Sequence, residues 1–512
     1  MAGRISQFFG RLFGQRPAAR KPNRQTQFFA QMQGMGGWDA AKNTRLTEHW
    51  QPGDQSPSLI HQVDATSLRN RCRDLMRNNP VARSAIKGYV ANVIENGITP
   101  DPILPDGADK VAWLDAWNRW AAEEADITGH EHLSELQATW LEEVLVAGGC
   151  IENRVVLNRR DSRGRRLPLA IELLPEERIA DDRDFMTPPE TVSGRKVVRG
   201  VEVNRYGKPV AYWLRRTLPN DLHSSFQQPL RVDAGPLSYG FIRDRVSQYR
   251  GWPILGVTVG LLWKLGYYTD NEMMASAIKS CFAAVITTDG DVNGLNTDGD
   301  TADDDGNTFD SMQPGIVSHL KPGEKIEGIG PNMPGGDSLP WLQMLIRSIA
   351  SGTEISYEEV ARDFSQTTFS SNRASANADK RRFRMKQRFT INQFLAPIYP
   401  EFVTWAVQAG LDGFPTPSEF LNRRDEWIKT SWRTPGWPSV NPLDDAQAAV
   451  LEIDNRLNSR ANYLGERGHD VDEVFAELAA EEAKAESLGL TSTDSENAEA
   501  IATNPPQSAE RG

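Results

Sequence analysis

Two segments with helical periodicity, residues 253–283 and 337–351, constrain this chain more than any other feature. Pro253 suits the first turn of a helix, and no proline follows it before Pro314. At 1.5 Å per residue, about 30 residues form a rod of roughly 45 Å. The apolar face of the second segment consists of Leu339, Leu342, Leu345, Ile346 and Ile349. The sequence therefore predicts two rod-like helices that bracket an insertion.

The insertion between these helices is strongly acidic. No Lys or Arg occurs between Lys279 and Lys321, and the tract from Asp289 to Asp310 has the composition of a loop. Within it, oxygen-bearing side chains follow the spacing of a calcium-binding loop, at Asp289, Asp291, Asn293 and Asp300. Asp300 replaces the usual glutamate. A solvated acidic loop is therefore the favoured interpretation, and a calcium ion is the alternative; the sequence indicates no other cofactor.

The rest of the chain combines helical and strand periodicity. Helices are predicted at 66–97 with a break near Asn79-Pro80, at 108–124 and at 132–147. Trp113, Trp117 and Trp120 share one face of the second of these helices, a pattern typical of a core-facing stripe. Between 150 and 217 the period becomes two, which predicts β-hairpins. Further helices are expected at 374–396, 401–410, 443–458 and 470–485. The fold class is therefore α+β.

Composition excludes several classes of protein. The chain has 512 residues, which suits about three domains, and a net charge of −12, the opposite of the basic balance usual in proteins that grip DNA. Its three cysteines are too few and too scattered for a disulfide framework. No apolar run approaches the roughly 20 residues of a membrane span. The sequence contains no Walker, G-x-S-x-G, H-E-x-x-H or C-x-x-C motif, so no catalytic residue is assigned and a non-enzyme is expected.

One basic cluster contrasts with the negative net charge of the chain. Six of the nine residues from Lys380 to Arg388 are Lys or Arg, on a predicted helix. Two interpretations remain open for this cluster: contact with DNA phosphates, and pairing with acids of a neighbouring segment or subunit. We favour the second, because so many cations would retard DNA that must slide. The candidate contact residues are Lys380, Arg381, Arg384, Lys386 and Arg388.

Several stretches in the same order resemble the lambda-type family of tailed-phage portal proteins. They are Arg69–Ile86 with Gly97–Pro100, the hairpin Gly200–Tyr212, the R-x-S-Q-Y-R-G-W-P run at Arg245–Pro253, and Ile355–Ser365 followed by Phe369–Ala374. Ser247 departs from the family's glycine, which leaves the turn there open. Each stretch is weak alone, but the ordered set, which spans roughly residues 65–400, is specific.

The resemblance implies a portal fold with a defined order of parts. These are a basic N-terminal arm (1–40), a β-rich wing (41–252), two stem helices (253–283 and 337–354) flanking a clip (284–336), a tunnel-loop region (355–374), a long helix returning to the wing (375–437), a helical crown (438–485) and a disordered tail (486–512). The residues implied to face DNA in the tunnel loop are Thr367, Thr368, Phe369, Ser370, Ser371, Asn372 and Arg373.

The resemblance also implies a function and partners. The expected assembly is a homo-oligomeric ring, typically of twelve subunits, at one capsid vertex of the virion, formed in the host cytoplasm during assembly. Double-stranded DNA would pass through its channel for packaging, retention and ejection. Terminase, the major capsid and scaffold proteins and a head–tail adaptor would contact the ring, and no membrane span is implied. Another virion structural or adaptor protein is the alternative, followed by a metal-assisted nuclease.

Overall fold

The computed structural model describes residues 52–182, 195–219, 228–281, 285–288, 324–327, 338–437, 442–465 and 471–488, together with residues 45, 49, 50 and 221. The chain divides into two units, Met1–Ser56 and Pro57–Gly512. All features below belong to the second unit. The predicted N-terminal arm, the tail beyond residue 488, most of the predicted clip and all four calcium-ligand candidates lie outside the described residues.

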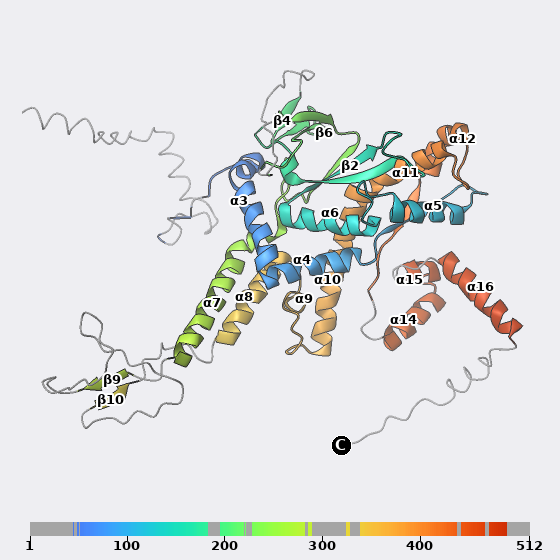
Figure 1. The fold of residues 1–512 in the computed structure, drawn as a ribbon. Helices are drawn as coiled ribbons and strands as arrows, with labels where there is room; N and C mark the ends of the chain where they lie inside the picture. The colour runs from blue at the N-terminus through green and yellow to red at the C-terminus, as the bar shows by residue number, and fades with distance from the viewer. Residues whose placement is uncertain are drawn as a thin grey trace, which may run out of the picture. The chain divides into compact units, whose positions relative to one another are not determined.

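Four helices open this unit, and the break between the first two is where the sequence placed it (Figure 1). They are α3 (Pro57–Asn78), α4 (Pro80–Ile94), α5 (Lys110–Glu123) and α6 (Leu133–Ala147). Asn79 ends one helix and caps the next, because its side chain accepts hydrogen bonds from the backbone N–H groups of Val81 and Ala82, both at 3.0 Å. Pro80 fills the first helical position, which needs no N–H donor. These helices confirm the prediction, although α3 begins nine residues earlier than the predicted start at 66.

Antiparallel sheets fill the stretch that sequence periodicity marked as β-rich (Figure 1). One has the order β3-β2-β8, from Leu169–Pro175, Cys150–Val156 and Leu237–Gly240. The other has the order β4-β5-β6-β7, from Lys196–Val198, Val201–Val203, Pro209–Leu214 and Leu230–Asp233. Both predicted hairpins, β2–β3 and β5–β6, are confirmed. A short turn of 3-10 helix, η2 (Glu176–Arg178), follows β3.

Two helices lie side by side where two rods were expected (Figure 1). A 3-10 turn, η3 (Ile254–Val257), leads into α7 (Val259–Cys281), and α8 is Ser338–Thr353. Between them in sequence, β9 (Val285–Thr288) pairs with β10 (Glu324–Glu327). The helical prediction is confirmed, with the start of the first helix tightened into the 3-10 turn. Among the helices that the structure describes, none is long and apolar enough to cross a membrane.

The polar stretch predicted as a loop is shorter than expected. Helix α9 (Tyr357–Ala361) is followed by seven residues, 362–368, and α10 (Phe369–Thr390) starts five residues before the predicted position. The expected loop residues from Phe369 to Arg373 are therefore helical. The cause is a reciprocal cap: Ser371 N donates to Thr368 Oγ1 at 3.3 Å, and Thr368 N donates to Ser371 Oγ at 3.0 Å.

The sequence predicts separate helices at 374–396 and 401–410, with Pro397 between them, but the structure shows no break there. A single π turn, η4 (Ile391–Leu395), joins α10 to α11 (Ala396–Ala409), with Pro397 in the first turn of α11. Proline lacks an N–H and cannot continue an α-helical ladder. The wider turn, in which Ala396 N donates to Ile391 O, carries the helical path past it.

The remaining described elements follow α11. Helices α12 (Pro417–Asn422) and α13 (Arg424–Trp427) precede β11 (Thr430–Arg433), which pairs with β1 (Thr99–Pro102). The last three helices that the structure describes are α14 (Pro442–Asp454), α15 (Arg460–Gly465) and α16 (Val471–Ser487). They confirm helix in the two predicted late segments.

The main core forms where the first helices meet α10 and α11. All three tryptophans of α5 are buried in it. The Phe402 ring of α11 lies 5.0 Å from that of Trp117 and 5.2 Å from that of Trp120. Such aromatic pairs bury large apolar areas and fix the helices against each other. The predicted stripe is therefore a core stripe.

Candidate functional site

Helix α7 carries an exposed apolar stripe. Trp263, Tyr267 and Met274 have exposed fractions of 63%, 59% and 65%. Their spacing of four and seven residues places them on one helical face. The rings of Trp263 and Tyr267 stack with centroids 5.5 Å apart and planes 9° apart. Exposed apolar stripes of this kind are typical of surfaces that contact another protein.

The opposite side of α7 is anchored. Leu262 and Leu265 are buried in the main core, and Asn79 donates to Leu262 O at 3.3 Å. Helix α8 is held through Ile349, which is fully buried. The two helices therefore have one face fixed against the core while the α7 stripe remains exposed.

The α9–α10 loop (residues 362–368) is organised by one carboxylate. Asp363 accepts hydrogen bonds from the hydroxyl of Tyr357 at 3.0 Å, from Ser365 N at 3.0 Å and from Ser365 Oγ at 2.6 Å. The hydrogen bond from the Ser365 side chain, followed by those from its backbone and from Tyr357, lowers the pKa of Asp363. Phe364 stands exposed at the loop.

The predicted DNA-facing residues divide between this loop and the start of α10. Thr367 Oγ1 donates to Phe364 O at 2.9 Å, so one hydroxyl is engaged within the loop. Thr368 and Ser371 are engaged in the helix cap, while Ser370 is exposed. Asn372 and Arg373 are half-buried on α10. The structure places all seven residues in one continuous segment but does not hold them in a single loop.

The basic cluster of α10 has an inner and an outer side. Lys386 is half-buried, with Nζ 6.0 Å from the ring centroid of Tyr89, and burial lowers the pKa of this lysine. Arg381, Arg384 and Arg388 are exposed at a spacing of three and four residues, which puts them on one face. Among the described residues, these three arginines form no ion pair, and Arg384 lies over the Trp437 ring at 5.9 Å. Lys380 is half-buried. Pairing within one chain, one part of the favoured interpretation, is therefore not observed for these three arginines.

A buried ionic cluster around Glu176 joins the helices to the sheets. Glu176 in η2 is fully buried; Arg250 Nε donates to its Oε1 at 2.9 Å and the Tyr239 hydroxyl to its Oε2 at 2.8 Å. His61 Nε2 of α3 lies 3.6 Å from the same carboxylate. Burial alone would raise the pKa of Glu176, but the charge of Arg250 and the contact with His61 outweigh it and lower the pKa to about 2. Burial lowers the pKa of His61.

The segment that carries Arg250 is a tightly built strap into α7. Gln248 Oε1 accepts from Asp244 N and Arg245 N, and its Nε2 donates to Arg250 O at 2.8 Å. Ser247 has φ of 64°, in the left-handed region that favours glycine. A Cβ on Gly251 would lie 1.9 Å from Gly148 O, so only glycine fits there. The turn left open by the sequence is therefore left-handed, with serine in it.

Metal-binding groups in the described part of the chain are of interest because the sequence offered a calcium alternative. No group of three or more His, Cys, Asp or Glu side chains there could hold a metal ion. The calcium candidates Asp289, Asp291, Asn293 and Asp300 fall outside that part, so calcium binding stays a prediction.

Comparison with known proteins decides the family. The family described as phage portal protein, lambda family, matches residues 43–387, more than half of the chain. The chain belongs to this family. Two relatives agree with that assignment. A probable portal protein of Halomonas phage phiHAP-1 is 23% identical over 467 residues, covering 88% of this chain and 87% of the relative. Portal protein B of Escherichia phage lambda is 22% identical over 478 residues, covering 86% and 88%.

A solved structure is also similar to this portal protein. It is the neck of a native gene transfer agent particle computed with C12 symmetry. The identity is 12% and the TM-score 0.41, over 79% of this chain and 97% of that one.

Two features of this portal protein were not predicted from the sequence. The α7 stripe was detectable in principle, since aromatic residues at 263 and 267 share a helical face, but periodicity alone does not say which face is exposed. The Glu176 cluster carried no signal, because its members His61, Glu176 and Arg250 are far apart in the chain and isolated charges are common on surfaces.

Proposed function

We propose that this portal protein is a ring-forming, non-enzymatic subunit that lines a channel for double-stranded DNA at one capsid vertex. Membership of the lambda portal family carries the proposal. The paired helices α7 and α8 would be the stem, β9 and β10 would belong to the clip, the β-rich part to the wing, and α14 to α16 to the crown. Twelve subunits per ring is the number that the family resemblance implies.

The α7 stripe supports a ring. A subunit that repeats around an axis contacts its neighbour through two different surfaces, and such contacts close when the rotation closes. The α7 stripe would be covered by the neighbouring subunit. The exposed side chains Leu339, Trp341 and Met344 of α8 provide further apolar surface for the same assembly.

The net charge supports a conduit more than a gripper. A charge of −12 repels the phosphate backbone, so DNA would meet no strong electrostatic trap. The α9–α10 loop and the start of α10 would face this DNA, with Thr367 and Ser370 as neutral contacts. The outer face of α10 (Arg381, Arg384 and Arg388) would contact acids of a neighbouring subunit or DNA phosphates. Terminase, capsid and scaffold proteins and a head–tail adaptor would dock on the ring within the virion.

A loop variant tests the conduit function. Deleting residues 365–372, the obvious change, would also remove the Thr368 cap and the first turn of α10. We therefore choose Phe364→Gly with Gln366→Gly, which strips two exposed side chains and leaves Asp363 and Thr368 in place. Rings should assemble normally, while the amount of DNA protected from nuclease inside particles should fall.

The matched control is Leu457→Gly, which removes an exposed apolar side chain from another turn. Packaging by the control should equal that of the natural chain. Normal packaging and retention by the loop variant would contradict the assignment of this loop to the channel wall.

A further inference from the structure

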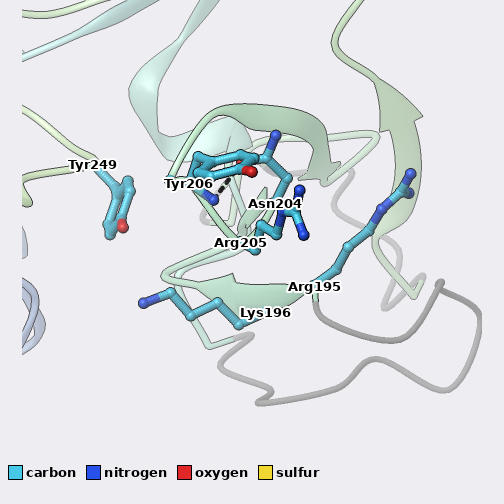
Figure 2. Close-up of a pocket in the computed structure, with 7 residues that line it drawn as sticks. Arg195, Lys196, Asn204, Arg205, Tyr206 and Tyr249 are labelled. Atoms are coloured by element: carbon cyan, nitrogen blue, oxygen red, sulfur yellow. Dashed lines mark hydrogen bonds between the residues drawn. The ribbon is translucent and has the colours of Figure 1, made fainter.

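A basic pocket opens on the β-rich part of the chain (Figure 2). Its volume is about 430 Å³. Three segments build it: the start of β4, the β5–β6 turn, and the strap into α7. The lining residues are Arg195, Lys196, Asn204, Arg205, Tyr206, Gly207 and Tyr249. A volume within the range of about 300–1,000 Å³ suits a group larger than a single inorganic ion.

The β5–β6 turn fixes the pocket's shape. Asn204 Oδ1 accepts hydrogen bonds from Tyr206 N at 2.9 Å and from Lys208 N at 3.0 Å. This leaves the amide nitrogen of Asn204 as a donor. Gly207 has φ of 83°, and a Cβ there would lie 3.2 Å from the hydroxyl of Tyr249. The turn and the strap are therefore in close contact.

Every charged side chain of the lining is a cation. Arg195 Nη1 lies 3.2 Å from Glu202 Oε1, so its charge is partly neutralised. Lys196 and Arg205 are exposed and pair with no acid among the described residues. Each instead lies over a tyrosine ring, Lys196 Nζ 5.7 Å from the centroid of Tyr249 and Arg205 Cζ 4.5 Å from that of Tyr206. Two uncompensated cations with amide and phenol donors suit an anionic ligand.

The surroundings of the Tyr206 and Tyr249 rings favour a protein carboxylate over a nucleic acid as the anionic ligand. A single-stranded nucleic acid would stack its bases on exposed aromatic faces. Here the Arg205 guanidinium lies over the ring of Tyr206, which is otherwise exposed, and Tyr249 is half-buried with the Lys196 ammonium near its ring. A guanidinium held over a ring keeps its fork of N–H donors available for a carboxylate. We propose that this pocket binds an acidic segment of a partner protein, whose side-chain carboxylates contact Lys196 and Arg205.

A titration with a model peptide tests the proposal. The probe is a short fluorescein-labelled Glu/Gly peptide, measured by fluorescence anisotropy against the full-length chain at low and high salt. The double variant Lys196→Glu with Arg205→Glu should weaken binding by roughly tenfold or more, and Lys196→Gln with Arg205→Gln should weaken it less. Added salt should weaken binding to the natural chain. Thermal melting should be unchanged, because both side chains are exposed.

Arg163→Glu, an exposed site in the β2–β3 turn, makes the same kind of charge change elsewhere and should leave binding intact. Equal weakening by that control would overturn the proposal, as would equal binding of a Gln/Gly analogue or no binding at all. Tighter, pocket-dependent binding of a single-stranded oligothymidylate would assign the pocket to nucleic acid instead. None of these outcomes depends on ring assembly, so the test is separate from that of the proposed function.

Discussion

Ser247 occupies a backbone conformation that costs a residue with a side chain about 1–2 kcal/mol. Its φ is 64°, and it lies in the strap that enters α7. Ser247→Gly should therefore raise the free energy of unfolding by about 1 kcal/mol, measured by urea denaturation. Ser247→Ala keeps the Cβ and should give no comparable gain. An unchanged or lower stability of the glycine variant would show that the serine side chain compensates for its conformation.

Arg250 neutralises a carboxylate that has no access to water. Replacing Arg250 by methionine keeps much of the volume but leaves Glu176 buried beside His61 without its main cation. The free energy of unfolding at neutral pH should fall by about 3–5 kcal/mol, again measured in urea. A matched exposed change, Arg163→Met, should have little effect. A loss below about 1 kcal/mol would mean that the cluster adds little to stability.

The ion pair between Arg250 and Glu176 predicts that the free energy of unfolding depends on pH. The folded-state pKa of Glu176 is depressed from its ordinary value of 4.5 to about 2. A depressed carboxyl pKa contributes stability above the unfolded value, and this contribution is lost as pH falls through the folded value. The difference in stability between the natural chain and Arg250→Met should therefore narrow between pH 4.5 and about 2. A difference that stays constant would show that Glu176 is not the titrating group.

At the scale of elements, periodicity and caps were enough to predict most helices. The break at Asn79-Pro80 and the tryptophan stripe of α5 follow local rules, so sequence alone located them. The sequence predicts a later start for α10 because Ser and Thr favour loops on average. In the structure, the side chains of Thr368 and Ser371 each accept a hydrogen bond from the other's backbone N–H and cap the helix. The predicted break at Pro397 is not observed either, because the single π turn η4 accommodates a residue that lacks a backbone N–H.

Candidate sites were harder to predict than elements, because they depend on tertiary contacts. The pocket around Tyr249 exists only because the sheet brings β4 and the β5–β6 turn beside the strap. No spacing along the chain encodes that meeting. The basic cluster of α10 was visible in sequence, but its division into Lys386 packed on Tyr89 and three outward arginines was not. The burial of each side chain, which composition does not reveal, distinguishes a cation that packs within the fold from one that is exposed and available to a partner.

At the scale of the whole molecule, α7 and α8 pack against each other and against the core, while the α7 stripe stays exposed. A chain that functioned as a single copy would leave this apolar surface in water, which disfavours that state. Trp263→Ser with Tyr267→Ser should therefore abolish assembly while the circular dichroism spectrum stays that of the natural chain. Leu457→Ser, in a turn far along the chain, is the control and should assemble normally.

Electron microscopy of the negatively stained, full-length chain is the most direct measurement of this account, with the two serine variants beside it. The natural chain and the Leu457→Ser control should form closed rings with a stain-filled axial pore, and the Trp263→Ser, Tyr267→Ser chain should remain as single copies. Single copies or poreless particles from the natural chain, under conditions where it is folded, would contradict the assignment as a ring-forming portal subunit.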